Sequence, residues 1–229
     1  MATALAPHAE TLRERHYTRL AGNYDRFLKY SPDFIRRMTE KMIDKLRLMP
    51  ADRFVDLGGG TGIYSIDILE QVALETPVLL VDPFEEMLAQ APHHSKLETL
   101  RDDALGFSER PLDYDKVLIK EAIHHVDEKR RLFGNLYRRL SSGGRVLLVH
   151  IPPEIDYPLF RKALERSRSW HADPSALVRA LEAAGFAAER DTLEYRHVLP
   201  KESYFSMVAG RYMSLLTSFT DAELEAGLA

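Results

Sequence analysis

A glycine-rich segment that directly follows a short apolar run constrains the fold of this chain more than any other feature. Residues 54–62 read FVDLGGGTG, so a strand-like stretch passes an acidic residue, Asp56, and then breaks into four glycines within five positions. Glycine tolerates positive φ and lets a backbone approach a ligand closely. In open α/β sheets such a turn lies at the carboxyl end of a parallel strand, where cofactors bind. The segment therefore predicts a cofactor-binding turn.

The spacing of these glycines narrows the kind of ligand. A dinucleotide-binding turn reads G-x-G-x-x-G, but Ile63 stands where the third glycine of that pattern belongs. A P-loop needs a lysine followed by serine or threonine, and the loop contains no such pair. Asp56, two residues before the glycines, suits a ligand that carries an ammonium group. A plain structural loop stays open as an alternative.

Asp56 to Gly62 resemble the first motif of the class I S-adenosylmethionine-dependent methyltransferases, which is an acidic residue followed by G-x-G-x-G. The resemblance extends from about residue 24 to about residue 188. It implies that Asp56, Gly58, Gly60 and Gly62 contact S-adenosyl-L-methionine, whose product form is S-adenosyl-L-homocysteine. It also implies a small-molecule substrate, of the kind found in secondary metabolism.

Composition bounds the domain organisation and the partners. A chain of 229 residues that is 45% hydrophobic favours one domain, with residues 1–50 as an N-terminal helical cap, 51–150 as the cofactor-binding core and 151–229 as a substrate lid. Neither a long apolar stretch nor a signal peptide is evident, so we expect a cytoplasmic protein without a membrane partner. The absence of cysteine excludes disulfides and thiolate metal sites, and a net charge of −4 argues against nucleic acid. We expect a monomer or a homodimer.

Strand-like and helix-like segments alternate through the middle of the chain, which predicts a Rossmann-like α/β fold with a doubly wound, mostly parallel sheet. Helices are expected at 10–21, 32–48, 64–72, 85–91, 127–140, 157–170, 174–184, 201–219 and 221–228, and strands at 53–57, 77–81, 97–100, 116–119, 145–149 and 188–198. The antiparallel seventh strand that the resemblance implies has no candidate. Either the sheet is short by one strand or the chain ends before it.

Acidic residues follow the second and third expected strands, on the edge where a cofactor would lie. Asp82 lies 20 residues after Gly62, and its carboxylate can accept both ribose hydroxyls, although it can equally cap the helix that follows. The resemblance places Phe84 beside adenine. It also aligns Asp103 with an aspartate that meets the adenine amino group, with Asp102 as the competing residue, and Tyr24 with a tyrosine that meets the methionine carboxylate. Further contacts to the cofactor are expected from Pro83, Met87, Ala104 and Lys120.

The segment after the fourth expected strand reads KEAIHHV and resembles methyltransferases with an L-H-H sequence, with Ile123 in place of leucine. His124 is the candidate general base, because a neutral imidazole can take a proton from an attacking hydroxyl or ring nitrogen near neutral pH. Simple alignment of the acceptor is the alternative, with His124 as an orienting residue. His125 is the second histidine of this candidate catalytic pair. A second histidine is common in the family whatever the reaction, which favours a structural role for it.

Substrate selection is expected from two segments rich in large side chains, 157–170 and 204–216, although ordinary core packing at helical spacing explains many of them equally well. Arg211 or His171 is expected to fix a polar substituent. The candidate substrate-binding residues are Glu121, His150, Tyr157, Trp170, Tyr204, Arg211 and Tyr212. No metal is expected, because the histidines lack H-x-x-x-H spacing.

The sequence thus favours an enzyme that moves a methyl group from S-adenosylmethionine to an oxygen, nitrogen or carbon atom of a small, aromatic or heteroaromatic metabolite. Two hypotheses for a different function stay open. One is an NAD(P)-dependent oxidoreductase on a related sheet, and the other is a protein that binds S-adenosylmethionine but acts only as a partner.

Overall fold

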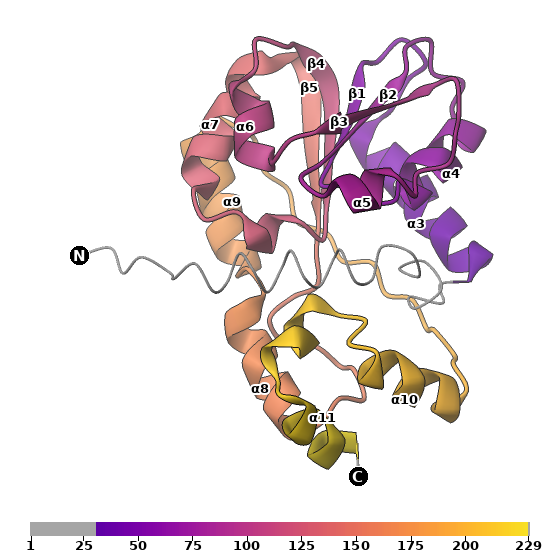
Figure 1. Ribbon diagram of the computed structural model, residues 1–229. Helices are drawn as coiled ribbons and strands as arrows, with labels where there is room; N and C mark the ends of the chain where they lie inside the picture. The colour runs from indigo at the N-terminus through magenta and orange to yellow at the C-terminus, as the bar shows by residue number, and fades with distance from the viewer. Residues whose placement is uncertain (1–30, 229) are drawn as a thin grey trace.

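A computed structural model describes residues 31–228 and shows a parallel sheet flanked by helices, with a helical lid at one end (Figure 1). The strands are β1 (Phe54–Leu57), β2 (Val78–Asp82), β3 (Leu97–Arg101), β4 (Tyr114–Lys120) and β5 (Leu140–Val149). Their order in the sheet is β3-β2-β1-β4-β5, and every pairing is parallel. The order reverses between β1 and β4, so a crevice is expected at the carboxyl ends of these two strands.

Helices cover both faces of this sheet because its central strands are apolar on both sides. One face packs on α3 (Pro32–Leu46) and α4 (Ile63–Gln71), with Met42 and Ile68 buried against Phe54. The other face packs on the helices to the left in Figure 1, with Phe133 and Leu177 in the same core as Val117. These helices are α6 (Ala104–Glu109), α7 (Lys129–Arg139) and α9 (Pro174–Ala183).

The lid has a hydrophobic core of its own, which lies beyond the carboxyl ends of the strands (Figure 1). Ala163, Met207, Leu215 and Leu216 are at its centre and are at most 3% exposed. The elements that supply this core are α8 (Arg161–Trp170), α10 (Lys201–Ala209), the 3₁₀ helix η3 (Ser214–Ser218) and α11 (Asp221–Leu228). No helix within residues 31–228 is long and apolar enough to cross a bilayer.

The expected fold class and the five core strands are confirmed. Within residues 31–228 no strand follows β5, so the sheet has neither the sixth strand that we expected nor the usual seventh. The expected strand at 188–198 is wrong. That segment is irregular and runs along α3, where Asp191 pairs with Lys45 at 2.6 Å and the Tyr195 hydroxyl donates to Asp33 at 2.8 Å. Tyr195 and His197, two residues apart, both face Phe34 of α3, whereas Val198 is 79% exposed.

The single helix expected at 201–219 is also wrong, because the chain breaks between α10 and η3. Arg211 has a φ of 57°, in the left-handed region that an α-helix cannot contain. The expected helix at 157–170 begins late, at Arg161, since Tyr157 precedes a proline and this disfavours helical backbone there. The helix expected at 10–21 lies outside the described residues.

Candidate functional site

The glycine turn between β1 and α4 adopts the conformation that its spacing predicts. Gly58, Gly60 and Gly62 all have positive φ, at 79°, 60° and 73°. The Gly58 N–H donates to the Val81 carbonyl at 2.7 Å, which ties the turn to β2. A Cβ atom on Gly58 would lie 2.5 Å from Cβ of Ala122, so a side chain there would collide with the segment after β4. The turn therefore needs glycine both for its backbone angles and for its close contact with β4.

Asp82, at the end of β2, is fixed against this turn. The Gly60 N–H donates to Asp82 Oδ2 at 3.0 Å, and the Phe84 N–H donates to Oδ1 at 2.9 Å. The side chain is 6% exposed, and this burial raises its pKa to about 6 despite the two donors, with a further contribution from the Asp56 carboxylate. A carboxylate has about four lone-pair sites, so two remain for a ligand. Capping and ligand binding are thus compatible roles here.

Asp56 lies next to Gly59 of the turn, and one of its two carboxylate oxygens accepts no hydrogen bond from the described residues. The Ser65 hydroxyl donates to Asp56 Oδ2 at 2.6 Å, while Oδ1 has no hydrogen-bond partner within residues 31–228. Burial raises the pKa of Asp56 to about 6, and the Ser65 hydroxyl and the Lys120 ammonium act in the opposite direction. Lys120 itself lies over the Tyr64 ring, 4.5 Å from its centroid. A buried carboxylate with a free oxygen fits the ammonium group of the expected cofactor.

Sequence reasoning missed Ser65 in this arrangement. Ser65 belongs to the first turn of α4. It is a small polar residue in an otherwise apolar stretch, Ile63-Tyr64-Ser65-Ile66, and this contrast could have marked it as a partner for a buried polar group.

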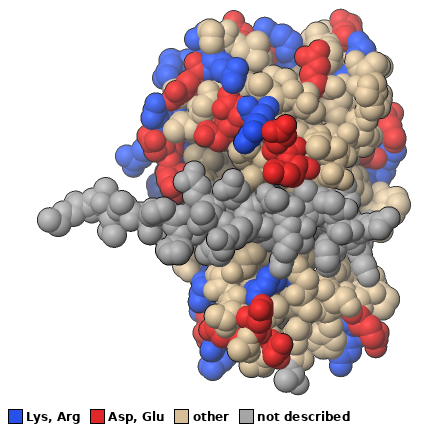
Figure 2. Space-filling model, viewed as in Figure 1, with Lys and Arg blue, Asp and Glu red and all other residues tan. Residues whose placement is uncertain are grey.

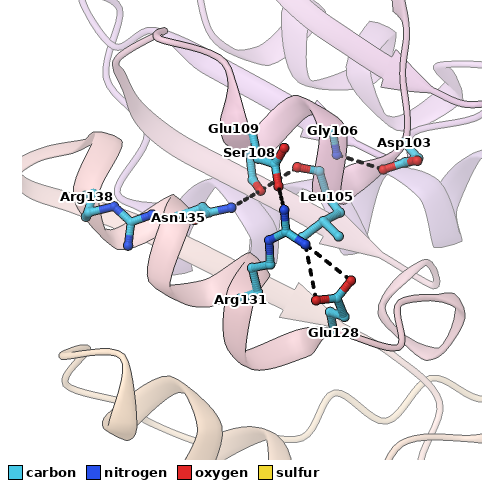
Figure 3. A network of polar contacts seen from close by, with 9 residues as sticks. All are labelled: Asp103, Leu105, Gly106, Ser108, Glu109, Glu128, Arg131, Asn135 and Arg138. Atoms are coloured by element: carbon cyan, nitrogen blue, oxygen red, sulfur yellow. Dashed lines mark hydrogen bonds and ion pairs between the residues drawn. The ribbon is translucent and has the colours of Figure 1, made fainter.

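Asp103 and Asp102, the two competing candidates for adenine, both have partners. Asp103 is the N-cap of α6 and accepts from the Gly106 N–H at 2.8 Å, whereas Asp102 pairs with Arg110 Nε at 2.6 Å. Figure 3 shows Asp103 at the start of α6, whose other end is bound to α7 by Asn135, which donates to Ser108 Oγ at 3.0 Å. Asp103 Oδ1 is used by the cap, so a cofactor contact would fall to Oδ2.

Beside these carboxylates, the remaining adenine-side candidates form the segment around α5 (Glu85–Leu88) and the start of α6. Met87 is buried beneath Gly60, with Cε 3.0 Å from the position of a Cβ there, whereas Pro83 is exposed and Phe84 half-buried. Ala104 is the first residue of α6. Tyr24, the candidate for the methionine carboxylate, lies outside the described residues.

Glu121, His124 and His125, the candidates for substrate binding and catalysis, follow the carboxyl end of β4 and so lie at the same edge of the sheet as the glycine turn. Glu121 has a φ of 53°, which is strained for a residue with a side chain, and its N–H donates to the Val149 carbonyl at 2.8 Å. Burial raises the pKa of its carboxyl, while Lys120, the Ile151 N–H and His150 oppose that rise. The 3₁₀ helix η2 (Ile123–His125) then places the His124 and His125 rings 3.9 Å apart.

The lid candidates divide into two groups. Burial raises the pKa of the Tyr157 hydroxyl, with further contributions from Glu121 and Tyr204. The Tyr204 and Tyr212 rings are 6.2 Å apart. His150, at the end of β5, makes a 3.0 Å hydrogen bond between Nδ1 and the Ile151 carbonyl.

Trp170 and Arg211 instead support the lid itself. Trp170 donates to Ser214 Oγ at 3.3 Å, and the Arg211 guanidinium donates to the Phe219 carbonyl and to Asp221, both at 2.7 Å. These bonds account for both side chains without a substrate. Their predicted role in substrate binding stays a prediction. Within residues 31–228 there is also no group of three or more histidine, aspartate or glutamate side chains placed to hold a metal ion.

Comparison with known proteins identifies the core. Residues 55–146 match the family described as a methyltransferase domain, and this range includes the glycine turn, Asp82 and the two histidines after β4. Residues 55–146 are a class I methyltransferase domain. The resemblance seen in the motifs is thereby confirmed, and the oxidoreductase alternative is not favoured.

The curated relatives of this chain are distant and longer. Phosphoethanolamine N-methyltransferase 3 of Arabidopsis thaliana is 26% identical over 177 residues, which cover 72% of this chain and 35% of the relative. A ubiquinone/menaquinone biosynthesis C-methyltransferase of Cereibacter sphaeroides is 24% identical over 158 residues, which cover 66% and 62% of the two chains. The chain therefore spans between about one third and two thirds of the length of these relatives.

Solved structures support the fold. A putative methyltransferase from an antibiotic biosynthesis pathway of Anabaena variabilis superposes with a TM-score of 0.65 at 20% identity, over 84% of this chain and 82% of that one. Phosphoethanolamine N-methyltransferase 2 of Haemonchus contortus, solved in complex with S-adenosyl-L-methionine, gives a TM-score of 0.64 at 18% identity, over 81% and 46%.

Proposed function

We propose that this protein transfers a methyl group from S-adenosyl-L-methionine to an oxygen, nitrogen or carbon atom of a small aromatic or heteroaromatic acceptor. The observation that carries the proposal is the hydrogen bond between the Gly60 N–H and Asp82 Oδ2 at 3.0 Å. It joins the glycine turn to the carboxylate that we expect to bind the ribose hydroxyls. The uncommitted Oδ1 of Asp56 adds a partner for the ammonium group in the same place.

The chain's own residues bind and orient in this proposal. Asp82 accepts hydrogen bonds from the ribose hydroxyls, Asp56 from the ammonium group, and the turn excludes water from one side. When bound, the cofactor supplies a methyl group on a positively charged sulfur, an electrophile that needs no further activation. His124 follows β4, at the edge of the sheet where the acceptor would lie. Its imidazole either takes the proton that the acceptor loses or holds the acceptor in line with the methyl group.

Two further observations support a small-molecule acceptor. The names of the curated relatives refer to phosphoethanolamine and to ubiquinone and menaquinone biosynthesis, which are small-molecule chemistry. Acidic and basic side chains also alternate over the visible face of the molecule in Figure 2, without the single-sign basic surface that a nucleic acid needs.

Calorimetry on the full chain tests the cofactor, with S-adenosyl-L-homocysteine and NADH titrated side by side. We expect micromolar binding of the first and none of the second. Mass spectrometry of small molecules from a cell extract, incubated with the protein and labelled cofactor, then tests transfer. Binding of NADH alone would refute the proposal. Binding of S-adenosyl-L-homocysteine without transfer to any acceptor would favour a non-catalytic partner protein instead.

A further inference from the structure

One histidine of the lid faces the tip of β4. His171 follows α8 as its C-cap, and its ring centroid lies 5.6 Å from that of His124 in an edge-to-face arrangement of 70°. The side chain is 9% exposed. His171 thereby lies beside His124, the residue that the proposed function places at the reacting end of the acceptor.

The ring nitrogens of His171 are buried without partners. Neither Nδ1 nor Nε2 hydrogen-bonds to any residue of the described part of the chain. One turn earlier on the same face of α8, the hydroxyl of Ser167 is fully buried and also has no partner there. Buried polar atoms without partners are few in native proteins, and each calls for an explanation such as a ligand that supplies the missing bond.

Burial also determines the protonation state in which the His171 imidazole would bind a ligand. It lowers the pKa of the imidazole to about 4, and the proximity of His150 adds to this. At neutral pH the ring therefore carries no charge, with one nitrogen as a donor and the other as an acceptor. A hydroxyl group matches such a pair because it both donates and accepts.

Within the described residues, two arginines of the lid and the lysine at the tip of β4 are engaged elsewhere. The Arg211 guanidinium is bound to main-chain carbonyls and to Asp221 within the lid. Arg166 stacks on the Phe219 ring at 4.8 Å, and Lys120 lies over the Tyr64 ring. Glu121 adds a carboxyl group, and not a cation, to the same edge of the sheet.

We propose that His171 binds the acceptor, through a hydroxyl group of a substrate that carries neither phosphate nor carboxylate. This inference rests on the proposed function and adds to it a residue and a substrate class. It separates this chain from relatives whose names refer to a phosphorylated amine.

Replacing His171 with phenylalanine tests the residue, because the ring stays and the nitrogens go. We expect KM for the acceptor to rise about 10- to 100-fold, the range for losing a buried hydrogen bond, while the affinity for S-adenosyl-L-homocysteine stays constant. The melting temperature without ligand should rise, since two unpaired buried nitrogens are removed. His171→Asn, which keeps a donor and an acceptor, should recover part of the KM effect. His93→Phe, at an exposed histidine, is the control and should change nothing.

Anion exchange tests the substrate class. The small-molecule fraction of a cell extract is separated into unretained and retained pools, and each is incubated with labelled cofactor. Label in the unretained pool supports the inference, as does a loss of that label in His171→Phe at low pool concentration. Label confined to the retained, anionic pool overturns the substrate class. An unchanged KM in His171→Phe, or a lowered melting temperature, overturns the role of the residue. Failure of the wild type to bind S-adenosyl-L-homocysteine would instead refute the proposed function.

Discussion

The two sides of the sheet edge differ in how their polar groups are satisfied. On the side of the glycine turn, both oxygens of Asp82 accept main-chain N–H groups, so the site is built by the backbone before any ligand arrives. On the lid side, His171 is almost as buried, but its two nitrogens have no partner in the described chain. A site built from the backbone depends on a short local motif. A site built from side chains depends on how a separate core, the lid, packs against the sheet.

Removing the Asp82 carboxylate should have the largest effect on the turn side. Two hydrogen bonds to a charged group contribute roughly 1.5–3 kcal/mol each, so Asp82→Ala should weaken S-adenosyl-L-homocysteine binding at least about 100-fold. Calorimetry measures this directly. Asp191→Ala, which removes an exposed carboxylate beside α3, is the matched control and should bind normally. Unchanged binding in Asp82→Ala would remove the ribose role.

His124 lies between the cofactor side and the lid side of the sheet edge, and its replacement tests its role in catalysis. His124→Ala should reduce turnover roughly 100-fold, within the usual range for a general base, while cofactor affinity stays constant. His125→Ala is the comparison, and a much smaller loss of turnover is expected because the sequence favours a structural role for this residue. Single-turnover kinetics with saturating acceptor provide the measurement. A loss of less than about tenfold in His124→Ala would favour alignment alone as the source of catalysis.

The geometry of the turn can be tested apart from its chemistry. Gly58 and Gly143 both have positive φ, but a Cβ would meet Ala122 at 2.5 Å in the first case and nothing within 4 Å in the second. We expect Gly58→Ala to lower the free energy of unfolding by about 2–4 kcal/mol and Gly143→Ala by about 1 kcal/mol. Urea unfolding measures both. Adding Ala122→Gly should partly restore Gly58→Ala, and equal losses at the two glycines would contradict the predicted collision.

The same contrast explains which parts of the molecule were predictable from sequence. The turn, the five core strands and the position of Asp82 follow from local patterns, because a buried parallel strand reads as an apolar run and a tight turn needs glycine. Ser65 escaped notice since its partner, Asp56, is nine residues away, across the turn.

The lid was harder to predict because its patterns are ambiguous. Residues 188–198 alternate like a strand, yet they lie along α3, and the helix expected at 201–219 breaks at Arg211. Both outcomes depend on contacts between distant segments, such as Asp191 with Lys45, that no local pattern encodes. His171 was expected to fix a polar substituent. Its position opposite His124, however, depends on how α8 packs against the core.

A further predicted effect is a difference in the pH dependence of stability between Asp82 and His171. Burial raises the pKa of Asp82 to about 6, above its usual value of 3.8, so the folded state binds more protons than the unfolded state between these pH values. Stability from this group is therefore lost as pH rises from about 4 to about 6. Asp82→Asn does not titrate, so its advantage in unfolding free energy over the wild type should grow by about 1–3 kcal/mol across that window.

His171 should show the opposite sign. Its pKa falls to about 4 from 6.5, so the unfolded state binds more protons between these values, and the wild type gains stability as pH rises through them. The advantage of His171→Phe should therefore shrink with rising pH, by about 1–3 kcal/mol, while that of Asp82→Asn grows. Urea unfolding of both variants and the wild type at pH 4, 5, 6 and 7 measures the two slopes. Both shifts come from burial, which raises the pKa of an acid and lowers that of a base. Slopes of the same sign would therefore mean that one of the two side chains is not held in its neutral form by burial.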